Sequence, residues 1–100
     1  MNRNLMRQAQ QLQQRLLKAQ EELEQLTVEA TAGGGAVKVV VSGKLKLQSL
    51  QITPEAVDPH EVEMLQDLVL TAVNEGLQKA QDAASQKMSA ITGGLKLPGM

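Results

Sequence analysis

The chain has 100 residues, carries a net charge of −1, and contains no Cys, Trp, Tyr or Phe and a single His. An apolar fraction of 42% is ordinary for a folded chain, and the length fits one domain. One His without Cys cannot supply a usual zinc site, and no thiol is available as a nucleophile. No aromatic ring can stack on unpaired bases. We therefore expect no catalytic residue, no metal and no cofactor.

Residues 2–28 are rich in Gln, Leu, Glu and Ala and lack Gly and Pro, which predicts a helix. Its apolar residues alternate between spacings of four and three, the heptad pattern of a coiled-coil seam. The seam consists of Leu5, Ala9, Leu12, Leu16, Ala19, Leu23 and Leu26. Such a helix is about 40 Å long, whereas a compact chain of this size has a radius of gyration of about 13 Å. We expect Leu12 and Leu16 to need cover from the other long helix or a second subunit.

Residues 28–53 alternate between apolar and polar side chains, which predicts a three-stranded antiparallel meander. Three glycines at 33–35 separate the first two strands, and Ser42-Gly43-Lys44 is a hairpin turn signal. The third strand is expected from Leu45 onward. Its apolar phase shifts by one residue, which predicts a β-bulge near Gln48–Ser49 or a strand partly covered on both faces.

A second long helix is expected from Pro59 to about Ile91, with Asp58 as its N-cap and Pro59 at its first position. The glycines at 93 and 94 would end it. We therefore expect a single α-β-β-β-α domain over residues 1–92 and a flexible tail over 93–100.

The first half of this second helix is apolar over most of its circumference. One small sheet can cover only one side of such a helix, which is a second argument for a homodimer. Leu65, Val69 and Val73 lie on its apolar stripe and are expected to pack against another helix or a second copy.

The charges are unevenly distributed along the chain: +4 for residues 1–20, −7 for 21–76 and +2 for 77–100. On a helical wheel, Arg3, Arg7, Arg15 and Lys18 face away from the leucine seam. If the two helices pack on the same side of the sheet, the start of the first lies near the end of the second, which carries Lys79 and Lys87. These six cations are the expected contacts to the phosphates of double-stranded DNA.

The chain also resembles a known family, the bacterial YbaB/EbfC nucleoid-associated proteins. The resemblance rests on an ordered set of segments: NLMRQAQQLQ at 4–13, GAVKV at 35–39, ITP at 52–54, EMLQDLV at 63–69 and GLKLP at 94–98. It implies an α+β homodimer shaped like tweezers, with projecting helices that bind double-stranded DNA. It also implies a non-enzymatic protein of the cytoplasmic nucleoid, with a role in nucleoid organisation and gene regulation.

Two other classes of function remain open at this point. Long helices flanking a hairpin are also typical of a coiled-coil interaction module or a prefoldin-like chaperone clamp, which would expose apolar rather than cationic helix tips. An enzyme would have to use His60, which lies in no nucleophile motif. No apolar run approaches the 18 or so residues of a membrane span, and we expect no signal peptide, no membrane partner and no small-molecule substrate.

Overall fold

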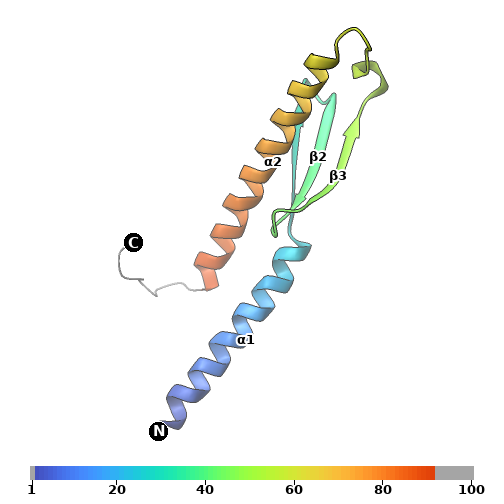
Figure 1. The fold of residues 1–100 in the computed structure, drawn as a ribbon. Helices are drawn as coiled ribbons and strands as arrows, with labels where there is room; N and C mark the ends of the chain where they lie inside the picture. The colour runs from blue at the N-terminus through green and yellow to red at the C-terminus, as the bar shows by residue number, and fades with distance from the viewer. Residues whose placement is uncertain (1, 92–100) are drawn as a thin grey trace.

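The computed structural model describes residues 2–91, which form two long helices and one antiparallel sheet (Figure 1). In chain order the elements are α1 (Arg3–Gln25), β1 (Thr27–Ala32), β2 (Val37–Ser42), β3 (Leu47–Ile52), a 3-10 helix η1 (Pro54–Ala56) and α2 (Val62–Ile91). This order confirms the predicted α-β-β-β-α arrangement and the α+β class. The expected tail at 93–100 lies outside the described residues, and the domain boundary at 92 stays a prediction.

The molecule is elongated because α1 points away from the rest of the chain (Figure 1). Its principal extents are 70 × 26 × 17 Å and its radius of gyration is 19.3 Å, against about 13 Å for a compact chain of this length. α1 has 23 residues, or about 35 Å. The projection expected from helix length is therefore present.

The sheet has the strand order β1-β2-β3, so β2 is central. Both pairs of strands are antiparallel. Along the second pair, Val40 lies opposite Ser49 and Val41 lies opposite Leu47, which leaves Gln48 as an extra residue on β3. This register shift confirms the bulge predicted from the change of apolar phase.

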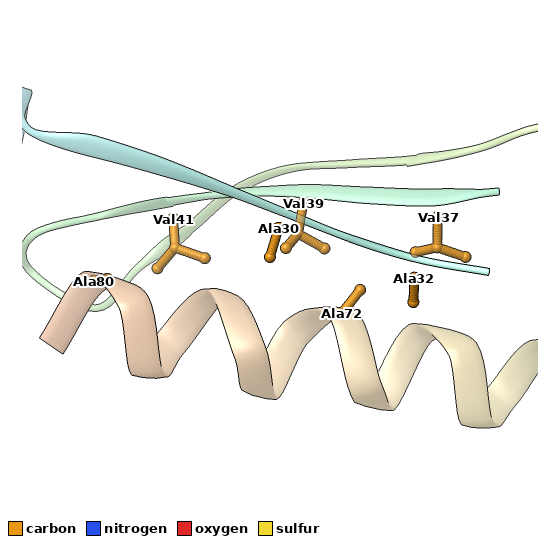
Figure 2. Packing of buried hydrophobic residues seen from close by; sticks show 7 residues of the cluster. All are labelled: Ala30, Ala32, Val37, Val39, Val41, Ala72 and Ala80. Carbon is orange, nitrogen blue, oxygen red and sulfur yellow. The ribbon is translucent and has the colours of Figure 1, made fainter. Parts of the chain in front are cut away.

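The core lies between one face of the sheet and α2 (Figure 2). Val37, Val39 and Val41 of the central strand are its largest fully buried side chains. The other buried side chains of this cluster come from β1 and α2 and are small: Ala30, Ala32, Ala72 and Ala80. Gly76 lets the helix approach more closely still, because a Cβ built there would lie 2.9 Å from a methyl group of Val39 and of Val41.

The boundaries of both helices differ from those expected. The N-cap role of Asp58 was wrong: its Oδ1 accepts a hydrogen bond from the His60 amide at 2.9 Å, and its carbonyl accepts one from the Glu61 amide at 2.9 Å. These bonds close a turn, and α2 begins only at Val62. An Asp that bonds the amide two residues on serves a turn as well as it serves a helix start.

α1 ends at Gln25 rather than near residue 28, because the chain joins the sheet at once. The amide of Leu26 donates to the carbonyl of Glu22 at 2.9 Å, which completes the last turn of the helix. The carbonyl of Leu26 accepts from the amide of Gly43 at 2.8 Å, so this residue already pairs with the β2–β3 hairpin. β1 then starts at Thr27.

The β2–β3 turn is longer than expected, and Leu45 belongs to it rather than to a strand. Leu45 has a φ of +63°, the left-handed region that costs an ordinary residue about 1–2 kcal/mol. The buried side chain of Ser42 holds the turn: its Oγ accepts from the amides of Lys44 at 3.3 Å and Lys46 at 3.4 Å. No glycine marks position 45, so the sequence carried no signal for this conformation.

Candidate functional site

The end of α2 reaches only the middle of α1. A shallow cavity between them is lined by Arg15, Lys18, Ala19, Glu22, Ala90 and Ile91. The two helices are joined there by an ion pair, with Lys87 Nζ 3.0 Å from Glu22 Oε2. Beyond this junction, the N-terminal part of α1 projects past the end of α2 (Figure 1). The expectation that the start of α1 lies near the end of α2 is therefore wrong, because α2 ends beside the stretch of α1 that contains Arg15 and Glu22 (Figure 1).

The four cations expected on α1 share an exposed surface. Arg3, Arg7, Arg15 and Lys18 are all exposed, and within residues 2–91 none of them forms an ion pair. Residues 1–20 contain no acid that could neutralise them. Arg15 and Lys18 also line a second hollow together with Gln11 and Gln14, whose amides are further hydrogen-bond donors. This surface, called the basic face below, can neutralise a row of anionic groups.

The two cations expected on α2 are engaged within the chain. Lys87 pairs with Glu22, as described above. Lys79 lies 4.0 Å from Glu75, and its Nζ donates to the backbone carbonyl of Glu29 on β1 at 3.2 Å. The two lysines are eight positions apart, which corresponds to about 12 Å along the helix. Lys87 therefore borders the basic face, while Lys79 lies against the sheet.

The structure brings three of the five predicted interface residues together in an open apolar groove. The groove has a volume of about 410 Å³. Its lining from α2 consists of Leu65, Gln66, Val69, Leu70 and Val73, and β3 contributes Ile52. The other two, Leu12 and Leu16, are half-buried on α1 and lie outside the groove.

The groove continues across β3. Leu50 and Leu47 pair with Val39 and Val41, whose side chains face α2. α2 nevertheless covers mainly β1 and β2, so Leu50 is 43% exposed and Leu70 is 61% exposed. The described chain alone thus leaves a contiguous apolar surface uncovered along α2 and β3, called the apolar groove below.

Two residues of the site were missed by reasoning from the sequence. The sequence does indicate an apolar surface at Leu70, because the first half of α2 is apolar over most of its circumference, but the exposure of Leu70 depends on where the sheet ends. Nothing in the sequence indicates that Glu22 pairs with Lys87, because the two residues are far apart along the chain. Among residues 2–91, no group of three or more His, Asp or Glu side chains could hold a metal, and His60 is exposed. The described helices include none long and apolar enough to span a membrane.

Comparison with known proteins identifies relatives over most of the chain. Residues 1–95 match the model of the YbaB/EbfC DNA-binding family. A nucleoid-associated protein of Pelotomaculum thermopropionicum is 58% identical over 96 residues, which cover 96% of this chain and 91% of the relative. One of Ruminiclostridium cellulolyticum is 55% identical over 98 residues, covering 97% and 85%.

A solved structure also has the same fold. The crystal structure of the uncharacterized protein HP0035 from Helicobacter pylori superposes with a TM-score of 0.80 at 20% identity. The match covers 93% of this chain and 99% of that one. The two-helix, three-stranded architecture is therefore common to both chains.

Proposed function

Because the chain belongs to the YbaB/EbfC DNA-binding family, we propose that it is a nucleoid-associated, non-enzymatic homodimer that binds double-stranded DNA through the basic face. The relatives that share more than half of its residues carry the name nucleoid-associated protein. Such a role includes nucleoid organisation and gene regulation.

The observation that carries this proposal is the unpaired basic face of α1, which extends from the junction with α2 onto the projecting part of the helix (Figure 1). Cations near a helix N-terminus oppose the helix dipole and destabilise the helix by a few tenths of a kcal/mol each, yet Arg3 and Arg7 stand in the first two turns of α1. No internal ion pair among the described residues accounts for them. Phosphates of a duplex supply the missing negative charge, and they require no aromatic side chain.

The salt dependence of duplex binding tests the proposal. We expect the logarithm of the binding constant to fall linearly with the logarithm of salt concentration, with a slope of about −0.9 for each phosphate contacted. Fluorescence anisotropy of an end-labelled duplex, measured between about 50 and 300 mM salt, gives this slope. Affinity that is independent of salt, or no binding at the lowest salt, would refute the proposal.

The homodimer is supported by the apolar groove. In a two-fold dimer the same patch of each subunit meets its copy, so Leu50, Val69 and Leu70 of one subunit would cover those of the other. Removing apolar surface from water is favourable by roughly 25 cal/mol per Å², so burial of this patch between two subunits would stabilise the dimer.

A charge in the apolar groove is expected to separate the subunits. Leu70→Glu places a carboxylate among apolar side chains, and burial of an unpaired charge is strongly unfavourable. Sedimentation velocity should show about half the mass of the unchanged protein. Val57→Glu is the matched control, because Val57 is also highly exposed, at 58%, and lies outside the groove. Equal masses for Leu70→Glu and the unchanged protein would exclude this surface.

Removal of the acid that pairs with Lys87 is expected to strengthen DNA binding. In Glu22→Gln the ammonium of Lys87 loses the carboxylate at 3.0 Å and becomes available to a phosphate beside Arg15 and Lys18. We expect a severalfold gain in affinity and a slope steeper by about 0.9 for each subunit. Glu24→Gln is the matched control. It removes the same charge two positions further along α1, where the carboxylate is not paired with Lys87, and it should change the affinity less. Equal effects of the two changes would contradict a specific role for Lys87.

A chaperone-like clamp is the second candidate, because the projecting part of α1 also exposes apolar side chains. Leu5 is 62% exposed and Met6 is 49% exposed. Suppression of the aggregation of an unfolded protein, measured by light scattering, discriminates between the two functions. If the suppression survives Arg3→Glu with Arg7→Glu while duplex binding is lost, the clamp function is favoured.

A further inference from the structure

We propose that the tip of α1 of one molecule docks into a hollow beside the start of α2 of another molecule, so that molecules associate head to tail. The tip consists of residues 3–7. The hollow is lined by the β1–β2 turn, the 3-10 helix η1, the turn before α2 and the first turns of α2. This contact is separate from the one in the apolar groove, and it does not depend on DNA binding.

The hollow combines apolar and acidic lining residues around a volume of about 330 Å³. The first turns of α2 contribute the apolar side chains of Met64, Leu65 and Leu68. The acidic lining residues are Glu55, Asp58 and Glu61. This site is called the acidic hollow below. A ligand that fits it joins an adaptable apolar group to positive charge, because pockets select ligands by a mostly apolar lining and a few polar groups.

The acids of the hollow belong to a part of the chain without Lys or Arg. Residues 47–78 contain six acids and no such cation. Within residues 2–91, none of the three acidic lining residues forms an ion pair. Asp58 accepts a hydrogen bond from the His60 amide, but two carboxylate oxygens have room for further donors. A partner can therefore bring positive charge to the hollow.

The tip of α1 carries the complementary groups. Arg3 and Arg7 are four positions apart and Met6 is three positions after Arg3, so the three side chains are neighbours on one side of the helix. Both arginines are exposed and unpaired among the described residues, and Met6 is 49% exposed. The unbranched side chain of Met adapts to an irregular apolar hollow. Guanidinium groups beside it can each donate two hydrogen bonds to a carboxylate.

The tip must come from another molecule, because the two surfaces lie at opposite ends of the chain. Figure 1 shows the start of α1 at one end and the start of α2 at the other, and the longest extent is 70 Å. The apolar groove and the acidic hollow share only Leu65, so covering the groove leaves most of the hollow accessible. A contact between two unlike surfaces produces rings or open chains rather than a closed pair.

Charge favours this contact over contacts between like ends. Two tips repel each other, as do two acidic hollows, whereas a tip and a hollow attract. Ion pairs near the surface are weak and are screened by salt. We therefore expect an association that is lost as the salt concentration rises. Burial of apolar surface is not screened in this way, so salt separates head-to-tail docking from pairing through the apolar groove.

Charge reversal on both surfaces tests the docking in the full chain without DNA. Sedimentation velocity is measured at about 30 and 300 mM salt over a range of protein concentrations. For the unchanged protein at high concentration, we expect a mean mass at least about twofold larger at the lower salt. Arg3→Glu with Arg7→Glu should abolish this excess, and so should Glu55→Arg with Glu61→Arg. All four changes in one chain restore opposite charges across the contact and should recover the excess.

Glu63→Arg with Asp67→Arg is the matched control, because both acids lie at the start of α2 but outside the acidic hollow. This control should retain most of the excess mass. Circular dichroism checks that each variant keeps its helices. If the fourfold variant loses them, the single exchange of Arg7→Glu with Glu61→Arg is measured in the same way.

Three outcomes would overturn the proposal: a mass of the unchanged protein that does not depend on salt, an equal loss in the control, or no recovery when the charges are exchanged. The masses are measured without DNA, and duplex binding by the unchanged protein is measured separately. Failure of the docking and failure of the proposed function are therefore distinguishable.

Discussion

Replacing Arg3, Arg7 and Arg15 together by Gln is expected to weaken duplex binding at about 50 mM salt by about a thousandfold for each subunit that contacts the duplex. Each cation that contacts a phosphate releases about 0.9 counterion, which at this salt corresponds to roughly tenfold in affinity. The slope of the logarithm of the binding constant against the logarithm of salt should become shallower by about 3 for each subunit. Gln preserves helix propensity, so far-ultraviolet circular dichroism should be unchanged.

The matched control for this triple variant removes three cations from the sheet side of the molecule. Lys38, Lys44 and Lys46 changed to Gln give the same net charge but leave the basic face intact. If binding depends only on the net charge of the protein, the two triple variants will lose affinity equally, and the basic face is not the contact surface. If the basic face makes the contacts, only the arginine variant will show the shallower slope.

Gly76→Val is expected to lower the free energy of unfolding by about 3 kcal/mol, at the upper end of the effects of overpacking. Even a Cβ at this position would lie 2.9 Å from Val39 and Val41, and both valines are fully buried in the central strand. The branched side chain has no free space to occupy, so α2 must move away from the sheet. Helix propensity favours the variant slightly, which means that any loss of stability comes from packing.

Asn74→Val is the control, because it introduces the same side chain into the same helix at an exposed position. Both variants are measured by urea denaturation at one protein concentration, since association contributes to stability. Circular dichroism is the suitable probe in a chain without Trp or Tyr. Equal midpoints for the two variants would mean that α2 and the sheet are not packed as closely as described.

The elements that periodicity determines could be predicted from the sequence. The heptad stripe gave α1, the alternation gave three strands, and the change of apolar phase gave the bulge at Gln48. Local signals failed at two positions, for different reasons. An Asp such as Asp58 can accept a hydrogen bond from the amide two residues later both in a turn and at a helix start, so its presence does not distinguish the two. Leu45 adopts a left-handed conformation that is usually marked by glycine.

For the candidate site, the sequence could predict which cations share a face of α1 but not which of them are free. Arg3 and Arg7 share that face because of local helix geometry. The pairing of Lys87 with Glu22 depends on how two distant helices cross. The apolar groove likewise requires knowledge of where α2 lies across the sheet, because the exposure of Leu70 and Leu50 arises only after the core has formed.

Because the junction between α1 and β1 is short, a small rotation there moves the far end of α1 by a large distance. Leu26 alone separates the two elements, and it is fixed on both sides by backbone hydrogen bonds to Glu22 and Gly43. α1 is about 35 Å long, so a rotation of about 10° at this junction displaces Arg3 by about 6 Å, close to the spacing of successive phosphates along a strand. The direction of the projecting arm is thus set by Leu26 together with the Glu22–Lys87 ion pair and the buried side chains of Ala19 and Leu23, all near the end of α1 that joins the sheet.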